Sequence, residues 1–313
     1  MTADPPPAAK IRLGTRQSPL AMAQAREAAE RLCAAHGWTP EAVELVPVLA
    51  SGDRIQDRAL ADIGGKALWT RELDQWLDEG RIDAAVHSMK DVETLRPDSF
   101  VIAAVLPRAD KADVLLGAAS IAALPQAATI GTSAPRRAAQ LLRARPDCRA
   151  VTFRGNVATR QRKLAEGEVD ATFLAAAGLD RLGEGGIGTR LDPCDWLPAP
   201  GQAAIGIECR ADAEATCALL AAIDHAPSHA EVLAERALLA ALGGSCHSAV
   251  ACLTQWHGEV LLLRAAIFSL DGTERVEGDA RFAPDDRDMP RALGLSLLER
   301  ASPALRASFA GPV

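Results

Sequence analysis

Arginine recurs in short turns rich in Gly, Ser, Thr and Asn, although the chain is acidic overall, with a formal net charge of −7. Three such turns lie at residues 15–18, 131–137 and 154–160. A guanidinium stays charged and offers a planar fork of donors to a carboxylate or phosphate, and nearby helix N-termini add backbone N–H groups. A single arginine is usually a solvated surface charge. Several in turns of this kind predict a ligand that carries many negative groups.

The best candidate for catalysis is the run His87-Ser88-Met89-Lys90-Asp91, which ends a short apolar segment. A carboxylate beside a lysine can transfer a proton or stabilise a developing cation. An arbitrary Lys-Asp pair at a strand end is more often a surface ion pair. The three anion-type turns in the same chain favour the catalytic interpretation.

Two loops carry weaker signals. Cys246 lies in a glycine-containing loop, where an exposed thiol can be a nucleophile or a covalent anchor, but a chain with seven cysteines can place an unreactive one there by chance. His247 is adjacent to it and would usually point elsewhere. Gly64-Gly65-Lys66 lacks the spacing of a nucleotide-binding P-loop, so it predicts either an ordinary loop or a mobile one with a single basic side chain.

Composition limits the class of protein. With 313 residues, 49% hydrophobic and 24% charged, the chain is long enough for two or three ordinary globular domains. The negative net charge argues against a nucleic-acid or anionic-membrane partner. Residues 1–10 contain no apolar leader, and no stretch approaches ~18 uninterrupted apolar residues, so we expect a cytoplasmic protein. Seven scattered cysteines without a Cys-x-x-Cys pair predict reduced thiols and no metal site.

Short apolar strands alternate with amphipathic helices in the first two-thirds of the chain. The predicted strands lie at 11–15, 43–49, 84–88, 113–116, 129–131, 151–153 and 171–175, and the predicted helices lie at 19–36 and 67–79 and begin at 135 and 156. Ser18 is a good N-cap for the first helix and Gly37 a good stop. The alternation predicts βαβ units around a largely parallel sheet, with function at the strand C-termini, where Arg16, Lys90, Asp91, Ser133 and Arg154 lie.

The pattern changes after Asp224. A helix at 230–242, hairpin-like strands to about 282 and a last helix from Pro290 predict a small α+β domain. Before it, two prolines and a glycine in residues 197–202 predict a hinge or a crossing strand.

Eight motifs in a fixed order resemble the porphobilinogen deaminase family, also called the hydroxymethylbilane synthases. The motifs are Thr-Arg-Gln-Ser-Pro-Leu (15–20), Gly-Gly-Lys (64–66), His-Ser-Met-Lys-Asp-Val (87–92), Gly-Thr-Ser-x-x-Arg-Arg (131–137), Arg-Gly-Asn-Val-x-Thr-Arg (154–160), Ala-Ala-Gly-Leu-x-Arg-Leu (176–182), Leu-Pro-Ala-x-Gly-Gln (197–202) and the Gly-Ser-Cys loop (244–246). The resemblance covers the chain from about residue 11 to the C-terminal domain.

The resemblance implies an α/β fold with two domains like those of type 2 periplasmic binding proteins, an active site in the cleft between them, and a small α+β C-terminal domain. On this basis residues 1–10 are expected to be a disordered tail. Residues 11–106 and 200–223 are expected to form domain 1, residues 107–199 domain 2, and residues 224–313 domain 3.

The resemblance also implies a transferase of tetrapyrrole (haem) biosynthesis, acting as a monomer. Four porphobilinogen molecules are deaminated and joined head to tail, with loss of ammonia at each addition, and hydroxymethylbilane is released by hydrolysis. The implied cofactor is a dipyrromethane made from two substrate molecules and held by a thioether to Cys246.

Family similarity assigns roles to individual residues. Asp91 is expected to be catalytic, assisting ammonia loss and stabilising positive charge on the pyrrole nitrogens. The expected partners of cofactor and substrate carboxylates are Arg16, Ser18, Lys90, Thr132, Ser133, Arg136, Arg137, Arg154, Arg160 and Arg181, with Lys66 in the active-site loop. Each porphobilinogen carries two carboxylates, which accounts for so many arginines.

The sequence departs from the usual family pattern at five positions. These are Ala134 in place of a second serine, Asp62 in place of a lysine, Trp69 in place of a phenylalanine, Ala203 in place of a glycine and Ala249 in place of a proline. None is the expected catalytic carboxylate or the anchor.

Two other functions fit part of the sequence. A cytosolic dicarboxylate-binding protein of the same two-domain architecture would use the arginines but gives no role to Asp91 or the Cys246 loop. A cysteine hydrolase using Cys246 and His247 would be inactivated by thiol alkylators, whereas a cysteine capped as a thioether resists them.

Overall fold

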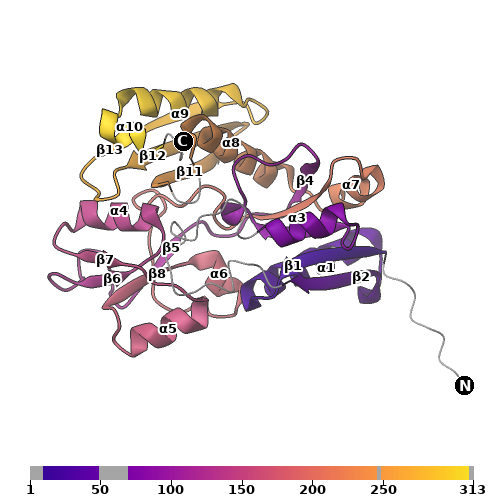
Figure 1. Cartoon of the computed structure of the whole chain (residues 1–313), viewed down its shortest axis with the longest axis horizontal. Helices are drawn as coiled ribbons and strands as arrows, with labels where there is room; N and C mark the ends of the chain where they lie inside the picture. Colours follow the sequence, from indigo (N-terminus) through magenta and orange to yellow (C-terminus); the bar gives the residue numbers. More distant parts are fainter. Residues whose placement is uncertain (1–9, 49–69, 245–247, 310–313) are drawn as a thin grey trace, which may run out of the picture. The chain divides into compact units, whose positions relative to one another are not determined.

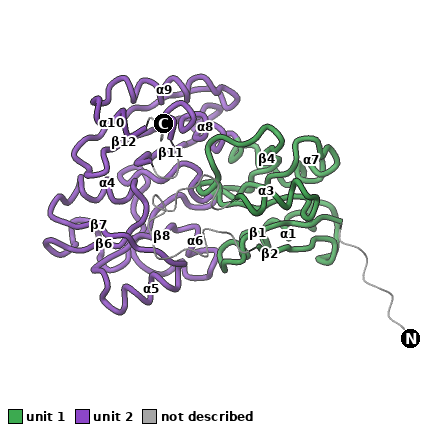
Figure 2. The backbone as a smooth tube through the Cα atoms, in the orientation of Figure 1, with its two compact units in different colours: residues 1–55, 65–108, 204–229 green, residues 56–64, 109–203, 230–313 purple. Residues whose placement is uncertain are grey.

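The structure is a computed structural model that describes residues 10–48, 70–244 and 248–309. Lys66, Cys246, His247, Asp62 and Trp69 lie outside these ranges. The chain forms two compact units (Figure 2): unit 1 comprises residues 1–55, 65–108 and 204–229, and unit 2 comprises residues 56–64, 109–203 and 230–313. Within the described ranges, no helix has the length and apolar character needed to cross a bilayer.

Unit 1 contains a five-stranded sheet with the order β2-β1-β3-β10-β4. Its strands are β1 (Ile11–Arg16), β2 (Val43–Val48), β3 (Ala84–Ser88), β4 (Phe100–Val105) and β10 (Ile205–Arg210). β1 is parallel to β2 and β3, whereas β10 runs antiparallel to β3 and β4. The expected largely parallel sheet is therefore mixed, because β10, which comes from a much later part of the chain, lies between β3 and β4 and runs antiparallel to both.

Helices cover both faces of this sheet. On one face α1 (Pro19–His36) and α7 (Glu214–Ala221) bury Leu32 and Leu220 against Leu13 and Val86. On the other face α3 (Arg71–Asp78) buries Leu73 and Leu77 against β3 and β4. Two 3₁₀ turns, η1 (Pro40–Ala42) and η3 (Met89–Asp91), complete the unit.

Local chemistry sets the ends of α1 where the sequence predicted them. Ser18 accepts a hydrogen bond from the Ala21 N–H, and Pro19 occupies the first helical position, where its missing N–H has no helical partner to lose. Gly37 ends the helix with φ +64°, a conformation that favours glycine.

The first sheet of unit 2 has the same pattern of parallel and antiparallel neighbours as the sheet of unit 1, but its second-last strand in the order, β5, comes first in the chain rather than last. Its order is β7-β6-β8-β5-β9. The strands are β5 (Asp113–Leu116), β6 (Thr129–Gly131), β7 (Arg149–Val151), β8 (Ala171–Ala175) and β9 (Thr189–Arg190), with helices α4 (Pro135–Ala144), α5 (Val157–Ala165) and α6 (Ala176–Arg181). β6 is parallel to β7 and β8, and β5 is antiparallel to β8 and β9.

A second sheet in unit 2 is a three-stranded antiparallel meander, which agrees with the α+β pattern predicted after Asp224. It consists of β11 (Val250–His257), β12 (Val260–Phe268) and β13 (Arg275–Phe282). Apolar residues of α8 (Ala226–Leu242) and α9 (Asp288–Arg300) share its core, and α10 (Pro303–Ala307) follows (Figure 1). The α/β class is confirmed, and the division into three domains stays a prediction.

Candidate active site

The predicted site residues divide between the two units, and each set is described by itself. Unit 1 contributes Arg16, Ser18, Lys90 and Asp91. The described residues that unit 2 contributes are Thr132, Ser133, Arg136, Arg137, Arg154, Arg160 and Arg181. Arg16 ends β1, and Lys90 and Asp91 follow β3, as the sequence predicted; in unit 2, Thr132 and Ser133 follow β6, Arg136 and Arg137 lie in the first turn of α4, Arg160 lies in α5 and Arg181 ends α6.

In unit 1, the structure brings Arg16 and Asp91 together. β1 and β3 are parallel neighbours, so their carboxyl ends meet at one edge of the sheet. Arg16 Nη1 lies 3.9 Å from Asp91 Oδ2, with side-chain exposures of 21% and 36%. An ion pair this long and this exposed contributes little stability. The pair matters because it places Arg16, which can bind a carboxylate, beside Asp91, which can transfer protons.

The turn that carries Lys90 and Asp91 is tied to α1 through Ser88. The amide of Gln24, a buried residue of α1, makes hydrogen bonds of 2.8 and 3.0 Å with the Ser88 hydroxyl. The same helix begins at Ser18, which is its N-cap. Gln24 therefore fixes the start of α1 against the end of β3.

Met89, the first residue of η3, is held in place by its backbone and by its buried side chain. Its backbone N–H donates to the Ala204 carbonyl at 3.0 Å, and its side chain is 3% exposed. A Cβ built on Gly206 of β10 would lie only 2.1 Å from Met89 Sδ. The absence of a side chain at Gly206 thus makes room for Met89, which holds the two residues that follow it.

A buried charge network lies on the α3 face of the same sheet. Arg96 donates to both oxygens of Glu208, at 2.9 and 2.7 Å, and also to Asp74 and Glu93. His87 Nε2 lies 3.3 Å from Glu208 Oε2. Burial alone would raise the pKa of Glu208, but the nearby His87 imidazole and the hydrogen bonds from Arg96 outweigh it and lower this pKa to about 2. Glu208, on the strand next to β3, is therefore ionised and has a structural role.

In unit 2, Ser133 joins two turns. Its hydroxyl donates to the Phe153 carbonyl at 3.0 Å and accepts from the Phe153 N–H at 3.1 Å. Because these bonds occupy the Phe153 backbone, β7 ends at Val151, and the strand predicted at 151–153 is placed two residues too late. Thr132 accepts from the Ala134 N–H, and Ala134 provides no side-chain cap for α4.

Arg136 and Arg137 converge on Asp113, a fully buried residue at the start of β5. Arg136 Nη2 lies 2.8 Å from Asp113 Oδ2, and Arg137 Nη2 lies 2.7 Å from Asp113 Oδ1. Trp196 and Gln202 also donate to this carboxylate. Burial alone would raise the pKa of Asp113, but the two guanidinium groups hold it well below its usual range. The arginine pair is therefore built around a permanent anion.

The three other predicted arginines of unit 2 lie near the start of α5 and at the end of α6. Asn156 caps α5 by accepting from the Thr159 N–H at 2.9 Å, and Arg160 Nε donates to the Gly155 carbonyl at 3.0 Å. Arg154, half-buried, immediately precedes Gly155, whose φ of +122° favours glycine. Arg181 Nη2 donates to the Ala203 carbonyl at 3.2 Å.

Among the departures from the family pattern that lie within the described residues, Ala203 shows backbone strain. Its φ is +69°, in the left-handed region that costs an L-residue roughly 1–2 kcal/mol and that a glycine would adopt freely. The resemblance to the family identified the change from glycine, and the structure shows that this position has a positive φ.

Sequence analysis missed Asp113, Gln24 and Gly206 as parts of the site. Each acts through a partner distant in the sequence, so no local motif marks it. Only Asp113 gave a signal, as a charged residue directly before the apolar run Val-Leu-Leu.

Unit 2 has donors that fit an anionic ligand. The Nε atoms of Arg136 and Arg137 are buried and have no hydrogen-bond partner within the described ranges. Two arginines and one aspartate leave one surplus positive charge there. The carboxylates of a dipyrromethane match both the donors and the charge.

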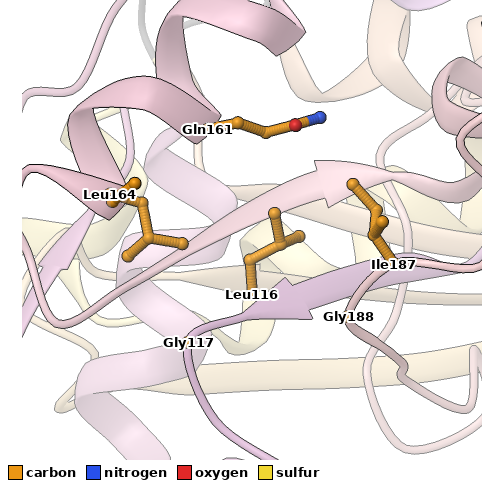
Figure 3. Close-up of a pocket in the computed structure, with 7 residues that line it drawn as sticks. Leu116, Gly117, Gln161, Leu164, Ile187 and Gly188 are labelled. Atoms are coloured by element: carbon orange, nitrogen blue, oxygen red, sulfur yellow. The ribbon is translucent and has the colours of Figure 1, made fainter.

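A separate cavity of about 330 Å³ lies in unit 2 (Figure 3). Leu116, Leu164 and Ile187 make its wall apolar, and Gln161 lies at its side. No predicted site residue lines it, so it has no part in the chemistry considered above.

Comparison with solved structures gives only weak likenesses. Periplasmic VFT2 domains of BvgS from Bordetella pertussis match with TM-scores of 0.41 and 0.40 at 17% and 16% identity. These matches cover 72% and 74% of this chain and 92% of each of those chains.

Comparison with families and curated relatives is far stronger. Residues 11–218 match the model "Porphobilinogen deaminase, dipyromethane cofactor binding domain", and residues 229–302 match "Porphobilinogen deaminase, C-terminal domain". A porphobilinogen deaminase of Sphingopyxis alaskensis is 58% identical over 306 residues, which is 96% of each chain. Another from Paracoccus denitrificans is 48% identical over 282 residues, covering 89% of this chain and 90% of the relative. Like its family, this chain is a transferase of tetrapyrrole biosynthesis that uses a dipyrromethane cofactor: it belongs to the porphobilinogen deaminase family.

Proposed function

We propose that Asp91 is the catalytic carboxylate with which this chain deaminates porphobilinogen and joins four molecules of it into hydroxymethylbilane. The observation that carries this assignment is the contact of Arg16 with Asp91 where β1 and β3 end. It places a group that binds substrate carboxylates beside a group that can exchange protons.

Asp91 has two tasks in this proposal. The aminomethyl group of the substrate reacts as its ammonium form: the C–N bond breaks, ammonia leaves with the bonding electrons, and the pyrrole is left with a positive charge. An ionised carboxylate within reach of the pyrrole nitrogen stabilises that charge. The new C–C bond then forms, and the carboxylate receives the proton lost when the ring regains aromaticity.

The cofactor is proposed to be attached to Cys246, and Lys66 to belong to the active-site loop; both lie outside the described residues. When bound, the dipyrromethane supplies the end from which the chain grows. The donors proposed to bind its carboxylates and those of the substrate are Arg16, Ser18, Lys90, Thr132, Ser133, Arg136, Arg137, Arg154, Arg160 and Arg181. In this set, the buried Nε atoms of Arg136 and Arg137 give the strongest support.

Several further expectations remain part of this proposal. They are the three-domain division, the monomeric state, the cytoplasmic location and the absence of a nucleic-acid or membrane partner. A dicarboxylate-binding protein without catalysis is not favoured, because the family match extends over both the cofactor-binding and the C-terminal domains.

Intact mass tests the cofactor attachment. After incubation with porphobilinogen, the wild type should gain the mass of two condensed porphobilinogen units, and Cys246→Ala should not. Cys194→Ala, which changes an exposed cysteine elsewhere in the chain, is the matched control and should load like the wild type. Loading of Cys246→Ala would refute the attachment site.

Turnover tests Asp91. Asp91→Asn should leave the fold and the cofactor in place but lose nearly all hydroxymethylbilane formation, because the amide can neither accept a proton nor balance the positive charge. Asp98→Asn, at an exposed position in the same unit, is the control. Near-normal product formation by Asp91→Asn would contradict the role given to Asp91.

A further inference from the structure

We infer that Asp113 is a positioning residue, which turns the side chains of Arg136 and Arg137 toward a single ligand carboxylate. The inference rests on the proposed function only in that the ligand is a carboxylate of the substrate or cofactor. Asp113 itself does not touch the ligand in this arrangement.

The geometry of α4 would by itself separate the two arginine side chains. Arg136 and Arg137 are consecutive residues in its first turn, and consecutive helical side chains point about 100° apart. Nevertheless both guanidinium groups reach the same carboxylate, one at each oxygen. Asp113 thus brings together two side chains that the helix alone would direct apart.

Asp113 has no acceptor site left with which to bind a ligand or exchange a proton. Trp196 Nε1 donates to Oδ2 at 3.0 Å and Gln202 Nε2 donates to Oδ1 at 2.9 Å, in addition to the two arginines. A carboxylate has about four acceptor sites, so four donors saturate it. Its exposure is 0%, and its low pKa keeps it ionised. A saturated, buried carboxylate fixes its partners and exchanges no proton.

Each of the two arginines keeps one hydrogen-bond donor for a ligand. Arg136 Nη1 donates to the Leu197 carbonyl at 2.8 Å, and Arg137 Nη1 donates to the Phe173 carbonyl at 3.1 Å. With Nη2 held by Asp113, each guanidinium is fixed at two points, and its Nε remains without a partner among the described residues.

The surplus charge identifies the group that these donors suit. Two arginines and one aspartate carry a net charge of +1, which one acetate or propionate of a porphobilinogen unit balances. A neutral ligand would leave this buried charge uncompensated. The arrangement therefore selects a carboxylate.

Asp113→Glu is the sharpest test, because it keeps the charge while moving the acceptor by about one C–C bond. Trp196→Phe is the matched control: it removes one donor to Asp113 and leaves both arginine contacts. For each variant we would measure the melting temperature, the porphobilinogen concentration that half-loads the chain by intact mass, and KM and kcat separately.

If Asp113 positions the arginines, Asp113→Glu raises the half-loading concentration and KM at least about tenfold, since a displacement near 1 Å costs up to about a hundredfold in precisely oriented sites. Trp196→Phe lowers the melting temperature and changes KM less than about twofold. Unchanged loading in folded Asp113→Glu, or an equal loss in Trp196→Phe, would overturn the inference.

A second measurement needs no change at Asp113. Arginine Nε–H resonances of the wild type are compared before and after loading with porphobilinogen, with Arg136→Lys and Arg137→Lys used for assignment. Both resonances should shift downfield when a carboxylate accepts from them. If the protein loads but neither resonance moves, the inference fails while the proposed function stands; if the wild type does not load at all, the proposed function fails first.

Discussion

Replacing Glu208 by Gln should remove a pH-dependent part of the stability of unit 1. Glu208 has a side-chain exposure of 2% and receives two hydrogen bonds from Arg96. Its pKa is lowered from 4.5 to about 2 by His87 and Arg96 against the opposing effect of burial. At about 1.36 kcal/mol per pKa unit, a difference of 2.5 corresponds to roughly 3 kcal/mol.

The sign follows from the direction of the shift. Because the folded pKa is below the unfolded one, the stabilisation is complete above about pH 4.5 and is lost as the pH falls toward about 2. At pH 3 about 2 kcal/mol of it should be gone, since the unfolded chain is then almost fully protonated at this group while the folded protein is not.

Urea unfolding followed by circular dichroism at pH 7 and pH 3 would measure the effect. The wild type should be more stable than Glu208→Gln at pH 7, and the difference should shrink by about 2 kcal/mol at pH 3. Asp98→Asn, at an exposed carboxylate of the same unit, should show no such change. A wild-type advantage that is the same at both pH values would refute the argument that His87 and Arg96 hold Glu208 ionised.

Three further substitutions test the packing around the site. Ala203→Gly should raise the free energy of unfolding by roughly 1 kcal/mol by relieving the positive φ, which thermal unfolding would show; a lower melting temperature would contradict it. Gly206→Ala should lower kcat by displacing Met89 and with it the turn that follows, and Met89→Ala in the same chain should restore part of it; no rescue would mean that the clash is not the cause. Ser133→Ala should lower the free energy of unfolding by about 1–3 kcal/mol, measured by urea unfolding, because the Phe153 N–H and carbonyl each lose their hydrogen bond with the Ser133 hydroxyl.

The parts of the fold that local chemistry determines were predictable from the sequence. The cap at Ser18, the stop at Gly37 and the apolar spacing between them define α1, and β3 and β8 were expected at the residues where they occur. The expected α/β class and the family resemblance were both confirmed by the sheets and by the family models.

Features that depend on distant partners were not predictable. β4 was not expected, and the strand that it pairs with, β10, lies more than a hundred residues later. Asp113 finds its donors 23, 24, 83 and 89 residues away, so no spacing in the sequence connects them. In the same way, Ala203 could be identified as unusual, but its φ comes only from the folded chain.

The position of β10 in the sheet of unit 1 has a consequence for how the protein is made. The strands of the first sheet in unit 2 all lie between Asp113 and Arg190, so they are available for pairing before β10 has been synthesised. Until residues 205–210 have left the ribosome, β4 has no strand to pair with and Arg96 has no Glu208. The N-terminal sheet, although translated first, is therefore completed after the one that follows it, and a chain released before residue 205 would carry an open sheet edge at β3.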